Sequence, residues 1–387
     1  MKKKIAILGS TGSIGKSLLN ILSKDKKKFE VILLTANKNY KLLLKQVKKF
    51  EVKNVIIKDL NSYKKFKKQN KNNRLNIYNN FRKLDLIFKK KIDYVMSAIV
   101  GLEGLEPTLK IIQYTKSIAI ANKESIICGW NLIKNKLKKN KTDFIPVDSE
   151  HFSIWYALKN NNLSNVNKII LTASGGSLLN LDTKKINNVS VKDVLNHPNW
   201  KMGKKITIDS STLINKVFEV IEAKNIFDIS LRKLSILIHP ASYIHSIIYF
   251  KDGMIKIIAH ETTMEIPIIN SIYKNNINKY EQNDVNISKL NNLNFSLVDK
   301  HKFPAVEILK YIPNKISLFE TVLVSANDEL VRLYLNKKIK YKDIIKLLIK
   351  IIKIKEFKKL NKIKPKNISQ IINLDKYVRL KINSKSV

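Results

Sequence analysis

The chain has 387 residues, with 73 Lys and Arg against 31 Asp and Glu, and a formal net charge of +42 at pH 7. Hydrophobic residues make up 44% of it and no charge-free apolar run reaches the length of a bilayer crossing, so we expect a globular protein without membrane insertion. The single cysteine, Cys128, excludes an internal disulfide framework and suits a reducing cytoplasm.

The excess of positive charge has two interpretations. A basic surface can bind nucleic acid or an anionic membrane, which gives the alternative of a basic nucleic-acid or membrane-surface binding protein with a vestigial nucleotide fold. The lysines, however, are spread along the chain among abundant Asn and Ile, without a basic motif interleaved with aromatic residues. All three residue types have AT-rich codons. We therefore attribute the charge to nucleotide bias and expect no specific nucleic-acid partner.

The first part of the chain alternates short apolar strands with helices. Residues 4–8 predict a buried strand, followed by the glycine-rich turn 9–15 and a helix over 16–23. Such a turn lets the backbone approach a pyrophosphate at the N-terminus of the helix. Further strands are predicted at 30–35, 52–57, 94–99 and 117–121. This pattern predicts an α/β fold whose N-terminal domain, residues 1–147, is a Rossmann-like doubly wound parallel sheet.

The loop after the second strand indicates which dinucleotide is bound. NAD-binding folds usually place an acid here, to hold the ribose 2′-hydroxyl. This chain has Asn37, Lys38 and Asn39 instead. A lysine suits a 2′-phosphate, so we predict NADPH rather than NADH, with a solvated loop lysine as the alternative. The Lys- and Asn-rich stretch 58–91 is interpreted as a polar spacer.

A pair of acids marks the start of the second domain. The apolar run 144–147 leads into Asp148, Ser149 and Glu150, and in an extended segment the two acids would point to the same side. Adjacent carboxylates repel each other unless a proton or a cation lies between them, and carboxylate oxygens are the ligands that Mg²⁺ and Mn²⁺ prefer. The alternative is a strand end with two solvated acids.

A third carboxylate comes from a later helix. Residues 209–212, Asp-Ser-Ser-Thr, are predicted to start a helix capped by Ser or Thr. On that helix Asn215, Glu219 and Glu222 share one face, and Lys216 lies one step round. Such a face can hold a phosphate and a metal ion together, or it can be a solvated polar face.

Two loops have features of a substrate site. Residues 173–176, Ala-Ser-Gly-Gly, follow a predicted strand and can cradle a phosphate or form a plain turn. Residues 197–203 contain Trp200 and are predicted to be a flap that closes over substrate, with a Trp-anchored surface loop as the alternative.

Antiparallel strands are predicted at 234–238, 244–250 and 254–259, in a sheet of a kind that often carries a dimer interface. We therefore expect residues 148–273 to form a central α+β catalytic domain. Residues 274–303 are Asn-rich and predicted to be a linker, and residues 304–387 a C-terminal helical domain. The apolar stripe of its helix at 341–354 indicates core packing rather than membrane-surface binding.

Taken together, seven stretches in this order resemble the 1-deoxy-D-xylulose 5-phosphate reductoisomerase family. They are Gly9-Ser-Thr-Gly-Ser-Ile-Gly15, Ala121-Asn-Lys-Glu-Ser125, Pro146-Val-Asp-Ser-Glu-His151, Ala173-Ser-Gly-Gly176, His197-Pro-Asn-Trp200 with Met202-Gly203, Asp209-Ser-Ser-Thr212 with Asn215-Lys216, and Ile238-His-Pro240 with His245-Ser246. Each is weak alone, but the ordered combination spans nearly the whole chain.

The resemblance implies an enzyme that depends on NADPH and on Mn²⁺ or Mg²⁺, with Co²⁺ as a further candidate. Its substrate would be a phosphorylated sugar, 1-deoxy-D-xylulose 5-phosphate. Retro-aldol cleavage and aldol re-closure would give a branched aldehyde, which NADPH reduces to 2-C-methyl-D-erythritol 4-phosphate in non-mevalonate isoprenoid biosynthesis. The resemblance also implies a homodimer.

Site roles are implied residue by residue. The metal ligands would be Asp148, Glu150 and Glu219. The substrate would be bound by Lys123, Ser149, Glu150, Ser174, His197, Ser210, Asn215 and Lys216, under Trp200 of the flap. The cofactor would be contacted by Thr11, Gly12, Ser13, Ile14, Asn37, Lys38, Asn39, Asn122, Glu124 and Gly203.

The chain departs from the family's pattern at four places. They are Asn37, Ser177-Leu178, Val217 and His260-Glu261-Thr262-Thr263. We expect these to change pocket shape rather than reaction type, because every metal-ligand match is intact. A semialdehyde dehydrogenase is the competing reductase, but that class usually needs a nucleophilic cysteine in its second domain, whereas Cys128 lies in the first.

Overall fold

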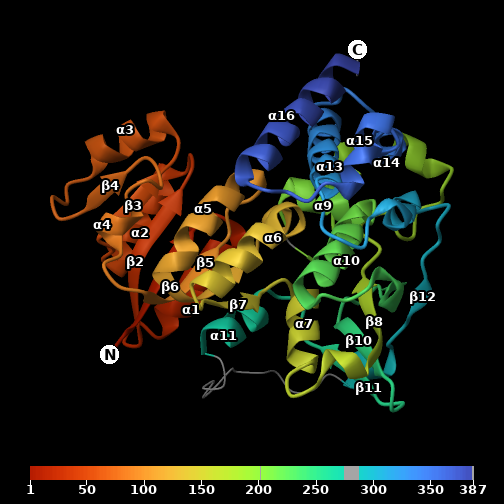
Figure 1. Ribbon diagram of the computed structural model, residues 1–387, viewed down its shortest axis with the longest axis horizontal. Coiled ribbons are helices and arrows are strands. Elements are labelled where there is room, and N and C mark those ends of the chain that lie inside the picture. Colours follow the sequence, from red (N-terminus) through yellow and green to blue (C-terminus); the bar gives the residue numbers. More distant parts are fainter. Residues whose placement is uncertain (201, 274–286, 386–387) are drawn as a thin grey trace. The chain divides into compact units, whose positions relative to one another are not determined.

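The computed structural model describes residues 1–200, 202–273 and 287–385, and Figure 1 shows it as a ribbon. The described chain divides into two compact units. The first contains residues 1–125, 131–148 and 264–273, and the second contains residues 126–130, 149–263 and 287–385. No helix among the described residues combines the length and apolarity needed to cross a membrane.

The first unit is built on a seven-stranded parallel sheet of order β4-β3-β2-β1-β5-β6-β7. The strands are β1 (Lys3–Leu8), β2 (Phe29–Ala36), β3 (Asn54–Ile57), β4 (Asn76–Tyr78), β5 (Ile92–Ser97), β6 (Thr115–Ile120) and β7 (Asp143–Pro146). Parallel strands covered on both faces need continuous apolar runs, and residues 5–8 of β1 are accordingly fully buried. The predicted doubly wound parallel sheet is confirmed.

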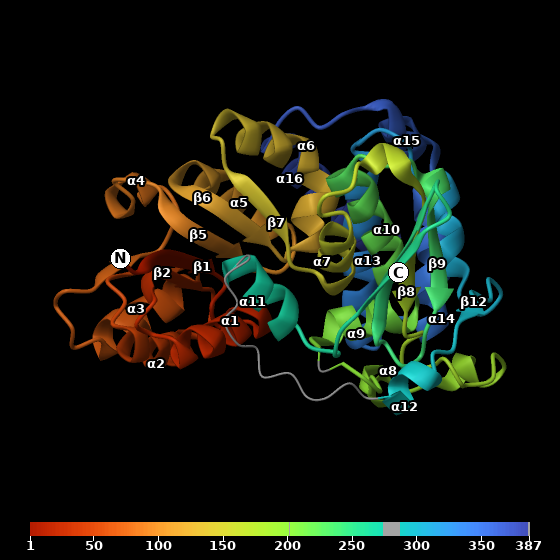
Figure 2. The same ribbon diagram turned by 90° about the horizontal axis from the view of Figure 1, so that it is seen from below.

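Helices cover both faces of this sheet, as Figure 2 shows. Helices α1 (Ser13–Lys24) and α2 (Tyr40–Phe50) lie on one face, and α5 (Leu105–Ile111) and α6 (Lys123–Lys139) on the other. From β1 the chain first adds β2, β3 and β4 on one side of the sheet, and then returns to add β5, β6 and β7 on the other side. The carboxyl ends of β1 and β5 therefore flank the switch point, where open α/β sheets bind their ligands.

Three segments differ from the sequence expectation. Residues 126–130, which contain Cys128 and which we assigned to the first domain, belong to the second unit. Residues 58–91 are more than a spacer, because they contain α3 (Leu60–Gln69), the edge strand β4 and α4 (Leu84–Ile87). The side chains of β4 are exposed or half-buried, so the strand needs no apolar run, and its sequence resembles that of a loop.

Residues 264–273, which we assigned to the catalytic domain, belong to the first unit through α11 (Glu265–Tyr273). Its Ser271 hydroxyl lies 2.7 Å from the hydroxyl of Tyr94 on β5, and the ring of Tyr273 packs edge-on against Phe29 at 5.4 Å between centroids. The buried face of α11 thus completes the core of the first unit.

The second unit contains a five-stranded sheet of order β11-β10-β8-β9-β12. Its strands are β8 (Val166–Ala173), β9 (Leu234–Ile238), β10 (Ile244–Phe250), β11 (Ile255–Ala259) and β12 (Ser296–Leu297). The prediction that 234–238 joins an antiparallel sheet with the next two strands was wrong in part: β8 separates β9 from β10, and β9 runs parallel to β8. The chain between β8 and β9 is a helical crossover, which returns the chain in the same direction.

That crossover supplies the helices that shape the second unit. They are α8 (Val191–Leu195), α9 (Lys204–Ser211) and α10 (Ile214–Phe227), preceded in the chain by α7 (Ser149–Ala157). Val220 and Ala223 of α10 pack on Leu171 and Ile248 of the sheet in one buried cluster. α10 is therefore held rigidly along the sheet.

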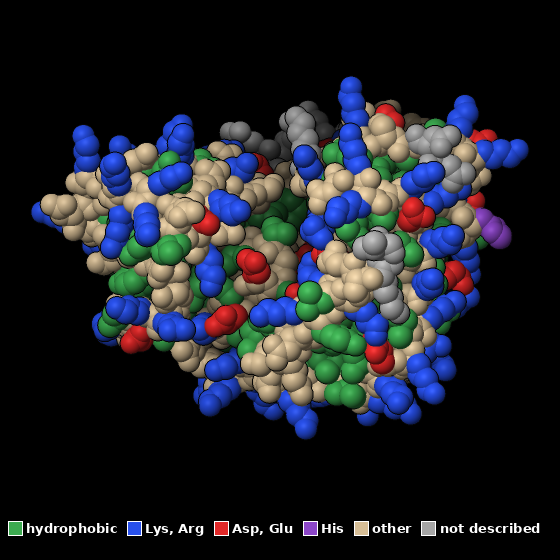
Figure 3. Space-filling model, turned by 90° about the horizontal axis from the view of Figure 1, so that it is seen from above, with side chains coloured by type: hydrophobic (Ala, Val, Ile, Leu, Met, Phe, Trp, Pro, Cys, Tyr) green, Lys and Arg blue, Asp and Glu red, His purple; other side chains and the backbone are tan. Residues whose placement is uncertain are grey.

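The C-terminal part is helical, as expected. It contains the 3-10 helix η6 (Pro304–Tyr311), α13 (Phe319–Leu335), α14 (Tyr341–Ile352), α15 (Lys355–Lys359) and α16 (Ile368–Lys385). The predicted linker is more than a connection, because its residues 287–303 contain α12 (Ile287–Asn291) and β12. Ile344, Ile345 and Leu348 of α14 are buried, which confirms core packing for its apolar stripe. Residues 274–286 of the predicted linker lie outside the described residues. Figure 3 shows Lys and Arg side chains scattered over the visible surface rather than gathered in one patch.

Candidate active site

The glycine-rich turn between β1 and α1 is built for close backbone approach. Gly9 has φ +84°, and a Cβ on it would lie 2.7 Å from the carbonyl oxygen of Ala98. A Cβ on Gly15 would lie 2.5 Å from the carbonyl oxygen of Gly9. α1 begins after Gly12 without a side-chain cap, so its first amides are left available to an anion. Thr11, Gly12, Ser13 and Ile14 lie at this turn, as the sequence indicates.

The loop after β2 lies at the same edge of the sheet. Asn37, Lys38 and Asn39 are all exposed. Asn39 caps α2 by accepting a hydrogen bond from the amide of Leu42 at 3.2 Å, and the carbonyl of Lys38 accepts one from the hydroxyl of Ser62 at 3.0 Å. The backbone of the loop is thus fixed while the Lys38 side chain faces solvent.

The loop after β6 is organised by Asn122. Its side chain caps α6 by accepting a hydrogen bond from the amide of Ser125 at 2.5 Å, and it donates to the carbonyls of Ile99 and, at 2.8 Å, Gly101. Its amide group therefore ties the loop after β5 to the loop after β6. A direct cofactor contact by Asn122 stays a prediction, as it does for Glu124, which is buried beside it.

Three carboxylates predicted as metal ligands come together. Asp148, Glu150 and Glu219 each offer an oxygen, and these oxygens lie within 4.8 Å of one another. An ion with bonds of 2.0–2.1 Å holds opposite ligands about 4 Å apart, so the spacing is close to that of one octahedral site. Glu219 is 2% exposed, and the other two are half-buried.

The route by which two of these acids meet differs from the prediction. The extended conformation expected for 148–150 is wrong, because β7 ends at Pro146 and α7 begins at Ser149. Glu150 therefore lies in the first turn of a helix. A strand-to-helix turn brings the acids together, rather than the alternation of a strand.

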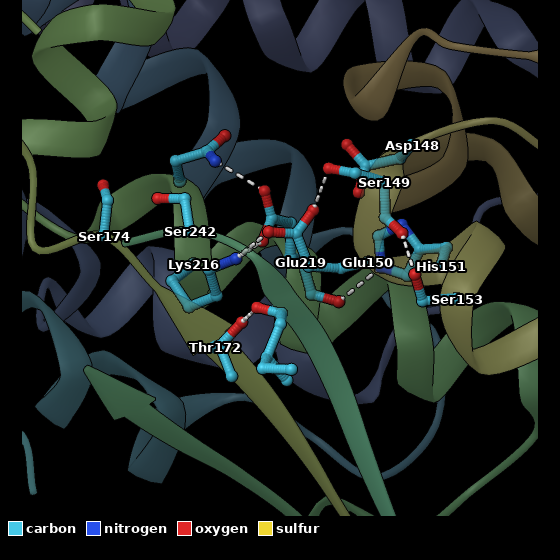
Figure 4. Close-up of polar contacts among 12 residues, drawn as sticks. Asp148, Ser149, Glu150, His151, Ser153, Thr172, Ser174, Lys216, Glu219 and Ser242 are labelled. Carbon is cyan, nitrogen blue, oxygen red and sulfur yellow. Dashed lines mark hydrogen bonds and ion pairs between the residues drawn. The ribbon is translucent and has the colours of Figure 1, made fainter. Parts of the chain in front are cut away.

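Two lysines pair with the three carboxylates. Figure 4 shows Lys216 reaching from α10 to Glu150 and Glu219, with its Nζ 2.5 Å from Glu150 Oε1. Lys123 Nζ lies 2.5 Å from Asp148 Oδ2. Burial opposes the charge on Lys216, but the carboxylates of Glu150 and Glu219 outweigh it and raise the pKa of the ammonium group. Glu219 Oε1 also accepts a hydrogen bond from Asn215 at 2.5 Å.

A second cluster contains the residues predicted to grip the phosphate. Ser174 Oγ lies 3.1 Å from His197 Nε2. A Cβ on Gly176, which has φ +70°, would lie 2.8 Å from the carbonyl oxygen of Ser210. The turn 174–176 therefore closes directly on the end of α9, beside Ser210.

The helix start predicted at 209–212 is wrong. α9 ends at Ser211, and α10 begins only at Ile214. Leu213 separates them in the left-handed conformation, with φ 61°. Ser210 thus lies at the end of one helix, while Asn215 and Lys216 lie at the start of the next.

His197 also fixes the predicted flap. Its Nδ1 accepts hydrogen bonds from the amides of Asn199 at 3.1 Å and Trp200 at 3.0 Å. The proton of the neutral ring is then on Nε2, which donates to Ser174, and burial lowers the pKa of His197. Lys201 of the flap lies outside the described residues. Gly203 caps α9, where an added Cβ would meet no atom within 4 Å.

Asn199 helps to hold the predicted flap in place, although the sequence analysis did not single it out. Its Nδ2 donates to the carbonyl of Pro240 at 2.6 Å and to Ser242 Oγ at 3.1 Å. Ser242 holds a positive φ of 52°, which a serine rarely adopts. The contact between residues 197–200 and 240–242 joins segments far apart in the sequence, so no local sequence pattern predicts it.

Comparison with known proteins identifies the family. Residues 5–129 match 1-deoxy-D-xylulose 5-phosphate reductoisomerase, and residues 144–227 and 260–381 match its C-terminal domains. The protein of that name from Pelagibacter ubique is 58% identical over 387 residues, covering 100% of both chains. The chain belongs to the 1-deoxy-D-xylulose 5-phosphate reductoisomerase family. The family member from Thermoanaerobacter pseudethanolicus is 40% identical, with 99% of each chain covered.

Solved structures of the family agree in fold over the whole chain. The reductoisomerase from Zymomonas mobilis in complex with NADPH has a TM-score of 0.88 and 30% identity, covering 100% of this chain and 99% of its own. A reductoisomerase in complex with NADPH, fosmidomycin and magnesium has a TM-score of 0.91 and 30% identity, covering 99% and 98%.

Proposed function

We propose that this enzyme converts 1-deoxy-D-xylulose 5-phosphate to 2-C-methyl-D-erythritol 4-phosphate, by rearrangement and then reduction, in non-mevalonate isoprenoid biosynthesis. It depends on NADPH and a divalent metal ion. The full-length identity to the reductoisomerases carries this conclusion, together with solved relatives that hold NADPH and magnesium. The alternative of a nucleic-acid or membrane-surface binding protein is not favoured, since the full-length relatives are reductoisomerases and the face drawn in Figure 3 shows no single basic patch.

The three converging carboxylates support the metal dependence. An all-oxygen set of Asp148, Glu150 and Glu219 suits Mg²⁺ or Mn²⁺, and Co²⁺ remains a further candidate. A divalent ion held there would act as a Lewis acid and template for the carbonyl and hydroxyl oxygens of the substrate. Ser149 and Lys123, which flank the carboxylates, are proposed to orient the carbon chain of the substrate.

The phosphate of the substrate is proposed to bind between the ends of α9 and α10. Ser174 and His197 are within hydrogen-bonding distance of each other, and Ser210 lies against the same turn. Lys216 and Asn215 complete the proposed set. Binding energy from the unreacting phosphate can orient the reacting end, and Trp200 is proposed to cover the bound substrate.

NADPH is proposed to bind at the carboxyl edge of the first unit's sheet. The uncapped amides of α1 suit the pyrophosphate, and the exposed Lys38 suits the 2′-phosphate. When bound, NADPH would supply the hydride for the reduction. The contacts proposed for Asn122, Glu124 and Gly203 complete the cofactor site.

A homodimer in the cytoplasm is part of the proposal. The edge strand β11 exposes Ile255 and Ile257, with 47% and 51% of each accessible, and a second copy covering this edge would bury both. The single cysteine is free, and a chain without an internal disulfide suits a reducing compartment. Light scattering of the purified chain tests the dimer, and a monomer at micromolar concentration would contradict it.

The decisive experiment follows NADPH absorbance with the proposed substrate, with and without Mn²⁺ or Mg²⁺. We expect turnover that a chelator stops and added metal restores. Binding of NADPH without any turnover in Mn²⁺, Mg²⁺ or Co²⁺ would refute the assignment of the reaction.

A further inference from the structure

Four aromatic rings of the second unit stand in a row between α7 and the flap. The ring of Phe152 on α7 meets His260 edge-on, with centroids 6.3 Å apart. His260 stacks on His245 of β10 at 3.7 Å, with 19° between the ring planes. His245 in turn meets Trp200 edge-on at 6.3 Å. The row therefore connects the helix that begins beside the carboxylates to the aromatic residue of the flap.

The two central rings are buried and fixed in orientation. His245 is 2% exposed and His260 is 8% exposed. His260 Nδ1 donates to the carbonyl of Glu261 at 2.8 Å, and its backbone amide donates to the carbonyl of Tyr243 at 3.0 Å. His245 Nε2 lies 3.1 Å from the carbonyl oxygen of His260. Burial lowers the pKa of His260, which favours the neutral ring that can stack closely.

Other contacts fix the main chain of the flap but not the direction of the Trp200 ring. His197 binds the amides of Asn199 and Trp200, and the Asn199 side chain binds the carbonyl of Pro240. These bonds place the Trp200 Cα. The indole itself can still rotate about its side-chain torsions unless a packed surface restrains it, and the edge of His245 is such a surface.

We propose that His260 is a positioning residue for Trp200, acting through His245. Its ring backs the ring of His245, so that His245 presents a fixed surface to the indole of the flap. Without that backing, His245 would gain rotamer freedom and Trp200 would sample several orientations. This inference deepens the proposed function, and its kinetic part alone rests on Trp200 covering the substrate.

The test uses the full chain labelled with 5-fluorotryptophan and observed by ¹⁹F NMR. The chain has three tryptophans, and Trp200→Phe assigns the Trp200 resonance by its loss. His260→Leu keeps apolar volume but removes the ring, His260→Phe keeps a ring that can stack, and His301→Leu is the control at an exposed histidine of the same unit. His260→Gln replaces His260→Leu if the latter fails to fold.

We expect His260→Leu to shift or broaden the Trp200 resonance and to leave that of Trp130 in place. Trp155 packs on Phe152, a neighbour of His260, so its resonance should shift less than that of Trp200. His260→Phe should keep the wild-type Trp200 signal. In turnover, His260→Leu should raise the KM for the sugar phosphate about two- to tenfold, the effect of one lost aromatic pair, with little change in kcat. His260→Phe should restore that KM.

Two results would overturn the inference. One is an unchanged Trp200 resonance in His260→Leu, and the other is an equal shift of all three resonances, which would indicate a general loss of packing. If the wild-type chain shows no turnover, the proposed function fails, but the NMR comparison still decides whether His260 positions Trp200.

Discussion

The ion pair between α10 and α13 offers a sharp test of how the active-site helix is held. Lys224 Nζ lies 2.9 Å from Glu320 Oε1 and 3.0 Å from the carbonyl oxygen of Pro313. Glu320 Oε2 accepts hydrogen bonds from the amide and hydroxyl of Ser317, at 3.0 and 2.5 Å. Lys224 is 4% exposed and Glu320 is fully buried. Removing one partner therefore leaves a charge that water cannot reach.

Lys224→Met should destabilise the second unit by about 3–5 kcal/mol, because it leaves the buried carboxylate of Glu320 without its cation. That is a large fraction of the roughly 5–15 kcal/mol that holds a typical domain folded. The double variant Lys224→Met/Glu320→Leu removes both charges and should recover much of the loss. Since α10 carries Glu219, the single variant should also weaken Mn²⁺ binding.

Urea denaturation followed by tryptophan fluorescence measures the loss of stability in the second unit, where the ion pair lies. Trp130, Trp155 and Trp200 all belong to the second unit, so their fluorescence reports its unfolding. Lys310→Met is the matched control, because its pair with Glu307 is on the surface and should contribute nothing measurable. A loss below about 1 kcal/mol in Lys224→Met, or a double variant less stable than the single, would refute the reasoning.

Three further predictions concern the site. Glu219→Gln should abolish turnover while NADPH titration still shows wild-type affinity, because the two proposed sites use different residues; joint loss of both would contradict separate sites. Lys38→Ala should raise the KM for NADPH several-fold and leave that for NADH unchanged, as paired steady-state assays can check. Burial lowers the pKa of His197 below its ordinary 6.5, so the stability contributed by its neutral ring is complete above pH 6.5 and is lost as pH falls through the lowered value. Urea denaturation at a series of pH values should therefore show a steeper acid loss for wild type than for His197→Gln, and parallel curves would disprove the role of the neutral ring.

Much of the first unit could be predicted because its signals are local. β1, the glycine turn and α1 lie next to one another in the chain, and a buried apolar run followed by glycines has few other structures available. The pairing of β9 could not be predicted in the same way. The apolar pattern of a strand indicates which of its faces is buried. Which strand it pairs with depends on the path of the chain before it, here about sixty residues between β8 and β9.

The sequence predicted which side chains come together in the site better than it predicted the backbone conformation that brings them together. The carboxylates converge as expected, yet residues 148–150 turn from strand to helix instead of remaining extended. Ser and Thr favour helix starts but do not exclude helix ends, so 209–212 was assigned to the wrong end. The true break is at Leu213, in a left-handed conformation that leucine rarely adopts and that sequence preferences therefore do not indicate.

The charges of the site suggest why metal and substrate should act together. The carboxylates of Asp148, Glu150 and Glu219 with the ammonium groups of Lys123 and Lys216 carry one net negative charge, which repels a phosphorylated sugar. A divalent ion held there would reverse the sign of that charge. Glu150 and Glu219, the carboxylates that would hold the ion, are also the partners of Lys216, so Lys216 would pair with them less tightly and would be more available to the substrate phosphate. Because Lys216 and Glu219 pair within one helix, binding of the metal ion would favour binding of the substrate phosphate.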